Sequence, residues 1–142
     1  MRSVVVYFIY VLSLLVTECI LVSGCYLMEN LVQYKFQFLL ITDALKNGLY
    51  INILRVMYYF PFYIIAFVFL IKQLGDNNRV LNIALINCGL YIFLSFLYGF
   101  ILIPDTMEYF LKPFFYYFII STFASPFILN MIPFYKRLVK GL

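Results

Sequence analysis

Four long apolar runs constrain the fold of this chain more than any other feature of its sequence. A helix needs roughly 20 apolar residues to cross a hydrocarbon core about 30 Å thick. Runs of about this length occupy residues 4–28, 50–71, 80–103 and 112–133. The bilayer core offers no water to bond the backbone, so helices, which pair their own backbone groups, are expected. The sequence therefore predicts an all-α integral membrane protein, with residues 1–142 as a single membrane domain.

The composition agrees with a bilayer as the solvent. The chain is 66% hydrophobic and 11% charged, whereas a soluble domain is about 45–50% apolar and about 25% charged. Its ten basic residues lie mostly at the ends of the apolar runs. This distribution is typical of residues that set membrane topology, and it is not typical of a nucleic-acid-binding surface. We expect the lipid bilayer as a partner and no nucleic acid.

The basic residues also predict the orientation, because cytoplasmic loops carry an excess of Lys and Arg. With the N-terminus inside, six basic residues lie inside: Arg2, Lys72, Arg79, Lys136, Arg137 and Lys140. The predicted fold is a four transmembrane helix antiparallel bundle with both termini inside (N-in/C-in), multi-pass in a bacterial inner membrane. Its parts are outer loops 29–48 and 104–111, an inner loop 72–79 and a basic inner tail 134–142.

The stretch LVSGC has two interpretations. Residues 22–25 resemble a lipobox, after which a bacterial lipoprotein would be cut and acylated on Cys25. A secretory apolar region, however, is about 7–15 residues long, and here it is longer and contains Glu18. An acid at mid-bilayer depth costs about 2.5–3.5 kcal/mol, which a helix that stays and finds partners can offset. We expect a retained helix, with Ser23 and Gly24 as small residues that another helix can approach.

Glu18 and Arg55 form a candidate intramembrane pair. Counted at 1.5 Å per residue from the outer ends of the first two helices, they lie at similar depth. Ionisable residues inside a membrane are functional candidates and face the bundle. In the alternative, Arg55 extends to the interface, and Glu18 is protonated or bonds a Thr or Tyr.

Three amides lie in apolar runs. Asn82, Asn87 and Asn130 are expected to make polar contacts between the third and fourth helices, and a substrate path is the alternative. Pro61 is expected to kink the second helix.

Signals for catalysis are absent from the sequence. The chain has no His, and its three Cys residues show no metal-ligand spacing. It also lacks a Gly-rich phosphate loop, an HExxH motif and a Ser/His/Asp set. We expect no enzyme activity, no cofactor and no metal.

The arrangement of residues 43–142 resembles that of the four-helix immunity proteins that protect bacteria from A-type pore-forming colicins. The shared features are an apolar helix ending in a short basic turn (IKQLGDNNR), a third helix, an outer loop, and a last helix running into Pro and a basic end (IPFYKRLVKGL). The resemblance implies bacteriocin immunity through contact with the channel-forming domain of the toxin inside the membrane. An AT-rich codon bias, suggested by abundant Phe, Tyr, Ile, Asn and Lys, agrees with a plasmid-borne or otherwise transferred gene.

Two other functions remain open from the sequence. One is a small four-helix flippase or transport component for lipid-linked sugars, in which Glu18, Arg55 and the amides would line a polar path. The other is an assembly subunit of a larger membrane complex.

Overall fold

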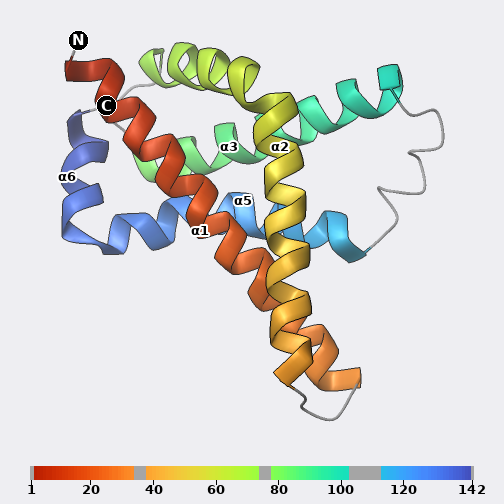
Figure 1. Ribbon diagram of the computed structural model, residues 1–142. Coiled ribbons are helices and arrows are strands. Elements are labelled where there is room, and N and C mark those ends of the chain that lie inside the picture. Colours follow the sequence, from red (N-terminus) through yellow and green to blue (C-terminus); the bar gives the residue numbers. More distant parts are fainter. Residues whose placement is uncertain (1, 34–37, 74–77, 103–112, 142) are drawn as a thin grey trace.

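The computed structural model describes residues 2–33, 38–73, 78–102 and 113–141, and every element among them is helical (Figure 1). The all-α prediction is therefore confirmed. The helices are α1 (Arg2–Gln33), α2 (Phe38–Lys72), α3 (Arg79–Leu102), α5 (Pro113–Met131) and α6 (Pro133–Gly141).

Two or three of these helices are long and apolar enough to cross a membrane. Val5–Val32 and Arg79–Leu97 qualify alone, and Phe115–Met131 qualifies together with Pro133–Val139 across a bend of 107°. The predicted run 50–71 lies on α2, but the side chains of residues 50–60 lie outside the described part, and the apolar stretch described there is Pro61–Lys72. The chain is thus a candidate multi-pass membrane protein.

Two predicted loops are corrected by the structure. Most of the expected outer loop 29–48 is helical, because α1 continues to Gln33 and α2 already begins at Phe38. Residues 29–48 contain no Pro, and a single Gly costs a helix only about 1 kcal/mol. Residues 134–141 of the expected tail 134–142 lie in α6, which starts with Pro133 at a position where the missing N–H costs no hydrogen bond. Residues 104–111 lie outside the described residues.

The short connection between α2 and α3 agrees better with the expected inner loop 72–79. Lys72 ends α2, and Arg79 begins α3. Asn78 has a φ of 54°, a left-handed conformation that Asn adopts more readily than most residues. Its carbonyl oxygen accepts a 3.0 Å hydrogen bond from the backbone N–H of Asn82, which starts the helix. Residues 74–77 lie outside the described residues.

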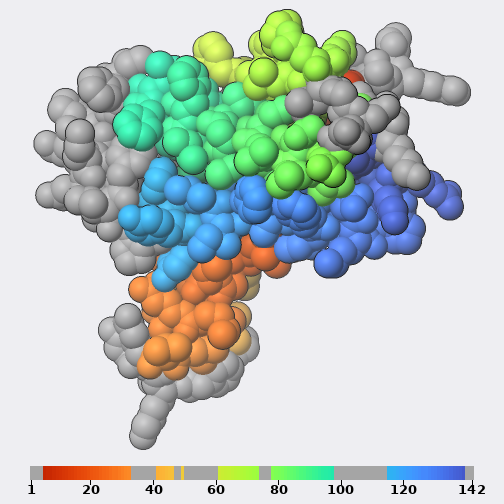
Figure 2. Space-filling view, turned by 180° about the vertical axis from the view of Figure 1, so that it is seen from behind, coloured from red at the N-terminus to blue at the C-terminus, as the bar shows by residue number. Residues whose placement is uncertain are grey.

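Helices α3 and α5 lie side by side and form the body of the molecule, while α1 crosses them diagonally (Figures 1 and 2). The second half of α1 pairs with the first half of α2 to form a lobe that stands away from this body. The α2 ribbon then changes direction and its second half runs back along α3 (Figure 1). Pro61 lies inside α2, as the predicted kink requires.

The core contains two apolar clusters. The large apolar cluster joins all five helices through the buried residues Tyr7, Tyr10, Val11, Leu14, Tyr63, Phe67, Ile71, Ile83, Leu94, Leu129 and Val139. The small apolar cluster consists of Val22 on α1, Tyr91 on α3 and Phe118 on α5. The rings of Tyr91 and Phe118 stack with their centroids 5.3 Å apart.

Polar residues lie on the same helix faces as these clusters. On α1, Glu18 stands four residues from both Leu14 of the large cluster and Val22 of the small one. On α3, Asn87 has the same relation to Ile83 and Tyr91. Residues four apart share one face of a helix. Glu18 and Asn87 are therefore directed into the core between the two apolar clusters.

Candidate functional site

Five polar side chains from four helices meet inside the protein and form what we call the polar junction: Glu18 on α1, Tyr63 on α2, Asn87 on α3, and Thr122 and Ser125 on α5. Tyr63 is 4% exposed and the other four are fully buried. Such a group, enclosed among apolar helices, is a functional candidate because intramembrane polar residues are costly to keep.

Asn87 is the centre of the junction. Its Nδ2 group donates a 2.6 Å hydrogen bond to Glu18 Oε1 and a 2.7 Å hydrogen bond to the carbonyl oxygen of Thr122. Its Oδ1 atom accepts a hydrogen bond from the hydroxyl group of Tyr63. Because an amide has two N–H donors, both are used by these short contacts. One side chain thereby links α3 to α1, α2 and α5.

Ser125 completes the junction on α5. Its hydroxyl group lies 3.1 Å from Glu18 Oε1 and 3.3 Å from the carbonyl oxygen of Thr122. Since a hydroxyl carries one hydrogen, it donates to one of these acceptors at a time. Thr122 Oγ1 donates to the carbonyl oxygen of Ile119 within α5, at 3.0 Å. Glu18 Oε1 thus receives donors from both α3 and α5.

The junction offsets the cost of burying an acid. Placing a carboxyl group at mid-bilayer depth costs about 2.5–3.5 kcal/mol, and an interhelical hydrogen bond in a membrane contributes about 0.6–2 kcal/mol. The two donors on Glu18 therefore recover a large part of that cost. They also favour one register of the helices, because a shift of α1 by one turn would leave several buried polar groups without partners.

The predicted site residues separate into different places. Glu18 and Asn87 come together in the junction. The side chain of Arg55 lies outside the described residues, so its pairing with Glu18 stays a prediction. Asn82 is half-buried near the start of α3, and Asn130 is half-buried at the end of α5, where it lines a hollow between helices.

Sequence reasoning did not assign Tyr63, Thr122 or Ser125 to the site. A signal for Tyr63 was its spacing of four and eight residues from Phe67 and Ile71, which shows that it faces the core. In the stretch STFAS of α5, Ser125 stands three residues after Thr122 and four residues after Ser121. A polar pair with helical spacing inside an apolar run predicts a polar interhelical contact, as seen here.

The residues that predict topology gather at one end of the protein. The large apolar cluster includes residues from the first part of α1, the last part of α2, the first part of α3 and α6, together with Leu94 and Leu129. These segments contain all six basic residues predicted to lie inside, among which Lys72, Lys136 and Arg137 are exposed. The side chains of Arg2 and Lys140 lie outside the described residues. Tyr7 near the start of α1 and Val139 near the end of α6 also belong to the same cluster.

Helix α6 is attached to α1 by Tyr135. Ser13 Oγ donates a 2.8 Å hydrogen bond to the carbonyl oxygen of Ile9 and therefore accepts the 2.8 Å hydrogen bond from the hydroxyl group of Tyr135. The ring of Tyr135 packs edge-on against that of Tyr10, and Val139 is buried in the large cluster. One face of α6 is thus bound to the core.

The cysteines are free thiols, and Cys19, Cys25 and Cys88 are each half-buried. Cys25 lies inside the continuous helix α1. Within the described residues, no group of three or more His, Cys, Asp and Glu side chains is placed to hold a metal ion.

Comparisons with known proteins found no family, no curated protein and no solved structure that matches this chain. Function is therefore inferred from the polar junction and from the surfaces around it.

Proposed function

We propose that this protein is an inner-membrane binding protein that gives its host immunity to a pore-forming bacterial toxin. It would act by contacting the channel-forming domain of the toxin inside the membrane. One observation supports this proposal above the others. The junction side chains are turned inward, and those of Glu18, Asn87 and Ser125 bond within the junction, while the outward faces of the helices are apolar. Such a molecule is suited to recognition between helices rather than to chemistry.

Two outward faces are suitable for recognition. The outer stripe of α1 contains Val16, Ile20, Gly24 and Met28, and the outer stripe of α3 contains Leu85, Gly89, Phe93 and Leu97. Both glycines are exposed, and a Cβ atom added at either would meet nothing within 4 Å. Small residues allow close approach of a second helix in lipid. Each stripe thus offers a shallow site between larger apolar side chains.

The finer membrane arrangement is part of this proposal. We infer four crossings with both termini in the cytoplasm, since the segments with the six basic residues gather at one end. Reporter fusions after Lys72 and Leu142 should be active only with a cytoplasmic reporter. A fusion near residue 36 should be active only with a periplasmic reporter. A periplasmic C-terminus would contradict this arrangement.

A transport role has less support. A flippase component would need polar groups along an open path, but Glu18, Asn87, Thr122 and Ser125 are fully buried and bond one another. The amide of Asn130 does line a hollow, but this hollow lies at one end of the molecule and not at the polar junction. Transport and assembly functions stay as alternatives.

The direct test is protection of a living cell. The chain is expressed in a sensitive bacterial host, which is then challenged with A-type pore-forming colicins and with any toxin encoded beside this gene. We expect higher survival and less potassium efflux with one toxin of the set. The control is an equal amount of another small multi-pass membrane protein. Absence of protection against every toxin, with the protein present in the membrane, would contradict the proposal.

Contact inside the membrane needs a second measurement. A photo-crosslinking residue at position 24 or 89 should link the protein to the channel-forming domain of the toxin. The same residue at Gln73, an exposed turn position at the end of α2, should not. Crosslinking only from Gln73 would indicate recognition outside the membrane.

A further inference from the structure

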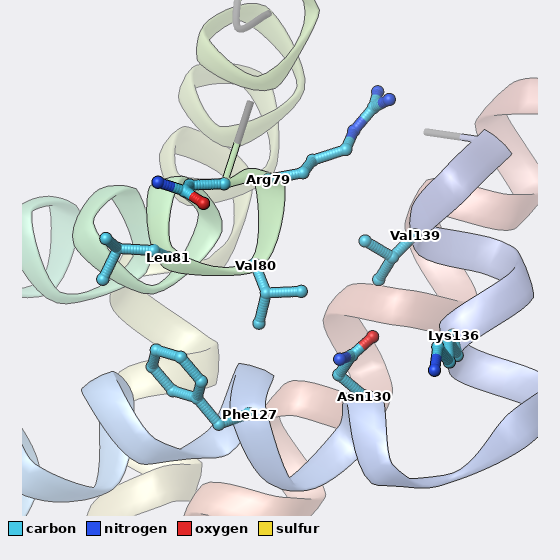
Figure 3. A pocket seen from close by; sticks show the side chains of 8 residues that line it. Arg79, Val80, Leu81, Phe127, Asn130, Lys136 and Val139 are labelled. Carbon is cyan, nitrogen blue, oxygen red and sulfur yellow. The ribbon is translucent and has the colours of Figure 1, made fainter. Parts of the chain in front are cut away.

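A hollow of about 800 Å³ lies at the end of the protein where α3 begins, α5 ends and α6 packs (Figure 3). Figure 3 shows Val80, Asn130 and Val139 directed toward one another across it, with Arg79 extending from α3 toward the side of α6. The lining residues are Asn78, Arg79, Val80, Leu81, Phe127, Asn130, Lys136 and Val139.

The lining combines two kinds of chemistry. Arg79 and Lys136 supply cationic groups, and the amide of Asn130 supplies a hydrogen-bond donor and an acceptor. Arginine binds phosphate oxygens with a planar fork of N–H groups, and lysine binds them as a point charge. Val80, Leu81 and Phe127 supply apolar walls. The hollow is therefore complementary to a ligand with an anionic head and an apolar body.

The start of α3 adds to this complementarity. Residues 79–81 form the first turn of that helix, where backbone N–H groups are not used within the helix. The positive end of the helix dipole favours an anion at this position. This contribution adds to the charges of Arg79 and Lys136 and does not stand alone.

The basic residues of helix α6 indicate the depth of the hollow relative to the membrane. The helix leaves α5 at 107° and buries Val139, while Lys136 and Arg137 stay exposed. Exposed Lys and Arg side chains at the end of an apolar helix lie at the membrane–water interface. If α3 and α5 cross the bilayer, the hollow lies at the level of the lipid headgroups.

We propose that this hollow binds the headgroup phosphate of an anionic phospholipid, with Arg79 and Lys136 supplying the positive charge that attracts the phosphate and Phe127 and Leu81 packing against the lipid body. The occupant is a lipid rather than a free phosphate ion because the walls beside the cations are apolar. This inference depends on the membrane location of the chain and not on the proposed immunity.

The test uses the full chain, purified in a mild detergent. Its thermal unfolding midpoint is followed during titration with phosphatidylglycerol, with phosphatidylethanolamine, and with inorganic phosphate. We expect saturable stabilisation by phosphatidylglycerol alone. Because each basic residue at an anionic surface contributes about a fivefold gain in affinity, the double variant Arg79→Gln/Lys136→Gln should bind about 30-fold more weakly.

A matched control removes two charges from the same end of the protein. Lys72 and Arg137 are exposed and do not line the hollow, so Lys72→Gln/Arg137→Gln should keep most of the affinity. The charge-retaining variant Arg79→Lys/Lys136→Arg should also keep it. Circular dichroism and the midpoint without lipid verify that each variant is folded. Equal stabilisation by phosphatidylethanolamine or inorganic phosphate, or equal loss in the matched control, would overturn the proposal.

Discussion

The side-chain amide of Asn87 on α3 donates a 2.6 Å hydrogen bond to the carboxyl group of Glu18 on α1, across 69 positions of sequence. Both side chains are fully buried. The contact links two helices that contain the two apolar clusters of the core. Much of the specificity of this fold therefore depends on one amide and one acid.

Replacing Asn87 should destabilise the protein more than replacing another amide in an apolar run. Asn87→Leu removes one donor from Glu18 and removes the hydrogen bond that the Tyr63 hydroxyl donates to Asn87. Unpaired buried polar groups cost about 1–3 kcal/mol each, so we expect a loss of about 2–3 kcal/mol. Unfolding by a denaturing detergent in mixed micelles measures it. The control is Asn130→Leu, at a half-buried amide on the hollow, with an expected loss below about 1 kcal/mol.

Glu18 and Asn87 should be energetically coupled. Removing one partner leaves the other buried with one hydrogen bond fewer, whereas replacing both by apolar residues removes the two polar groups of this bond together. The double variant Glu18→Leu/Asn87→Leu should therefore lose less stability than the two single variants combined, by about 1–2 kcal/mol. A double-mutant cycle measured by the same unfolding assay tests this. Simple additivity would show that the two side chains do not depend on one another.

Loosening α6 should expose the basic end of the chain to protease. Tyr135→Phe removes the hydrogen bond to Ser13 but leaves Ser13 bonded to Ile9, so the cost is that of one bond, about 1 kcal/mol. Cleavage by trypsin after Lys136 and Arg137 should become about fivefold faster if it follows the opening of α6. Tyr116→Phe, at an exposed tyrosine of α5, is the matched control. An unchanged cleavage rate in Tyr135→Phe would mean that Val139 and the rings alone hold α6.

Filling the outer glycine positions should separate folding from recognition. Because a Cβ atom at Gly24 or Gly89 meets nothing within 4 Å, Gly24→Leu and Gly89→Leu should leave stability within about 1 kcal/mol of the native value. At least one of them should reduce protection against the toxin, because the larger side chain keeps a second helix at a distance. Ile20→Leu, on the same stripe as Gly24, is the control and should protect normally. Full protection by both glycine variants would exclude the two stripes as contact surfaces.

Helix α6 and the first loop illustrate the limits of reading the sequence locally. Residues 134–142 looked like a tail because they are short and basic, yet Val139 and Tyr135 find partners on α1 and in the large cluster. Residues 29–48 were predicted to form a loop because they are only half-apolar, yet most of them form the end of α1 and the beginning of α2. The partner of α6 is a distant segment, and the ends of α1 and α2 pair with one another; local hydropathy registers neither contact.

The sequence alone determined that the described chain is helical and that it contains segments able to cross a membrane, because length and apolar content are local properties of each run. It also identified Glu18 as unusual, since an acid in an apolar helix is costly wherever the helix lies. Only the tertiary structure decided which donors meet that acid. Asn87 and Ser125 reach it because α1 packs across α5, and α3 lies beside α5. The position of such a crossing depends on the packing of all the helices together, which no single segment contains.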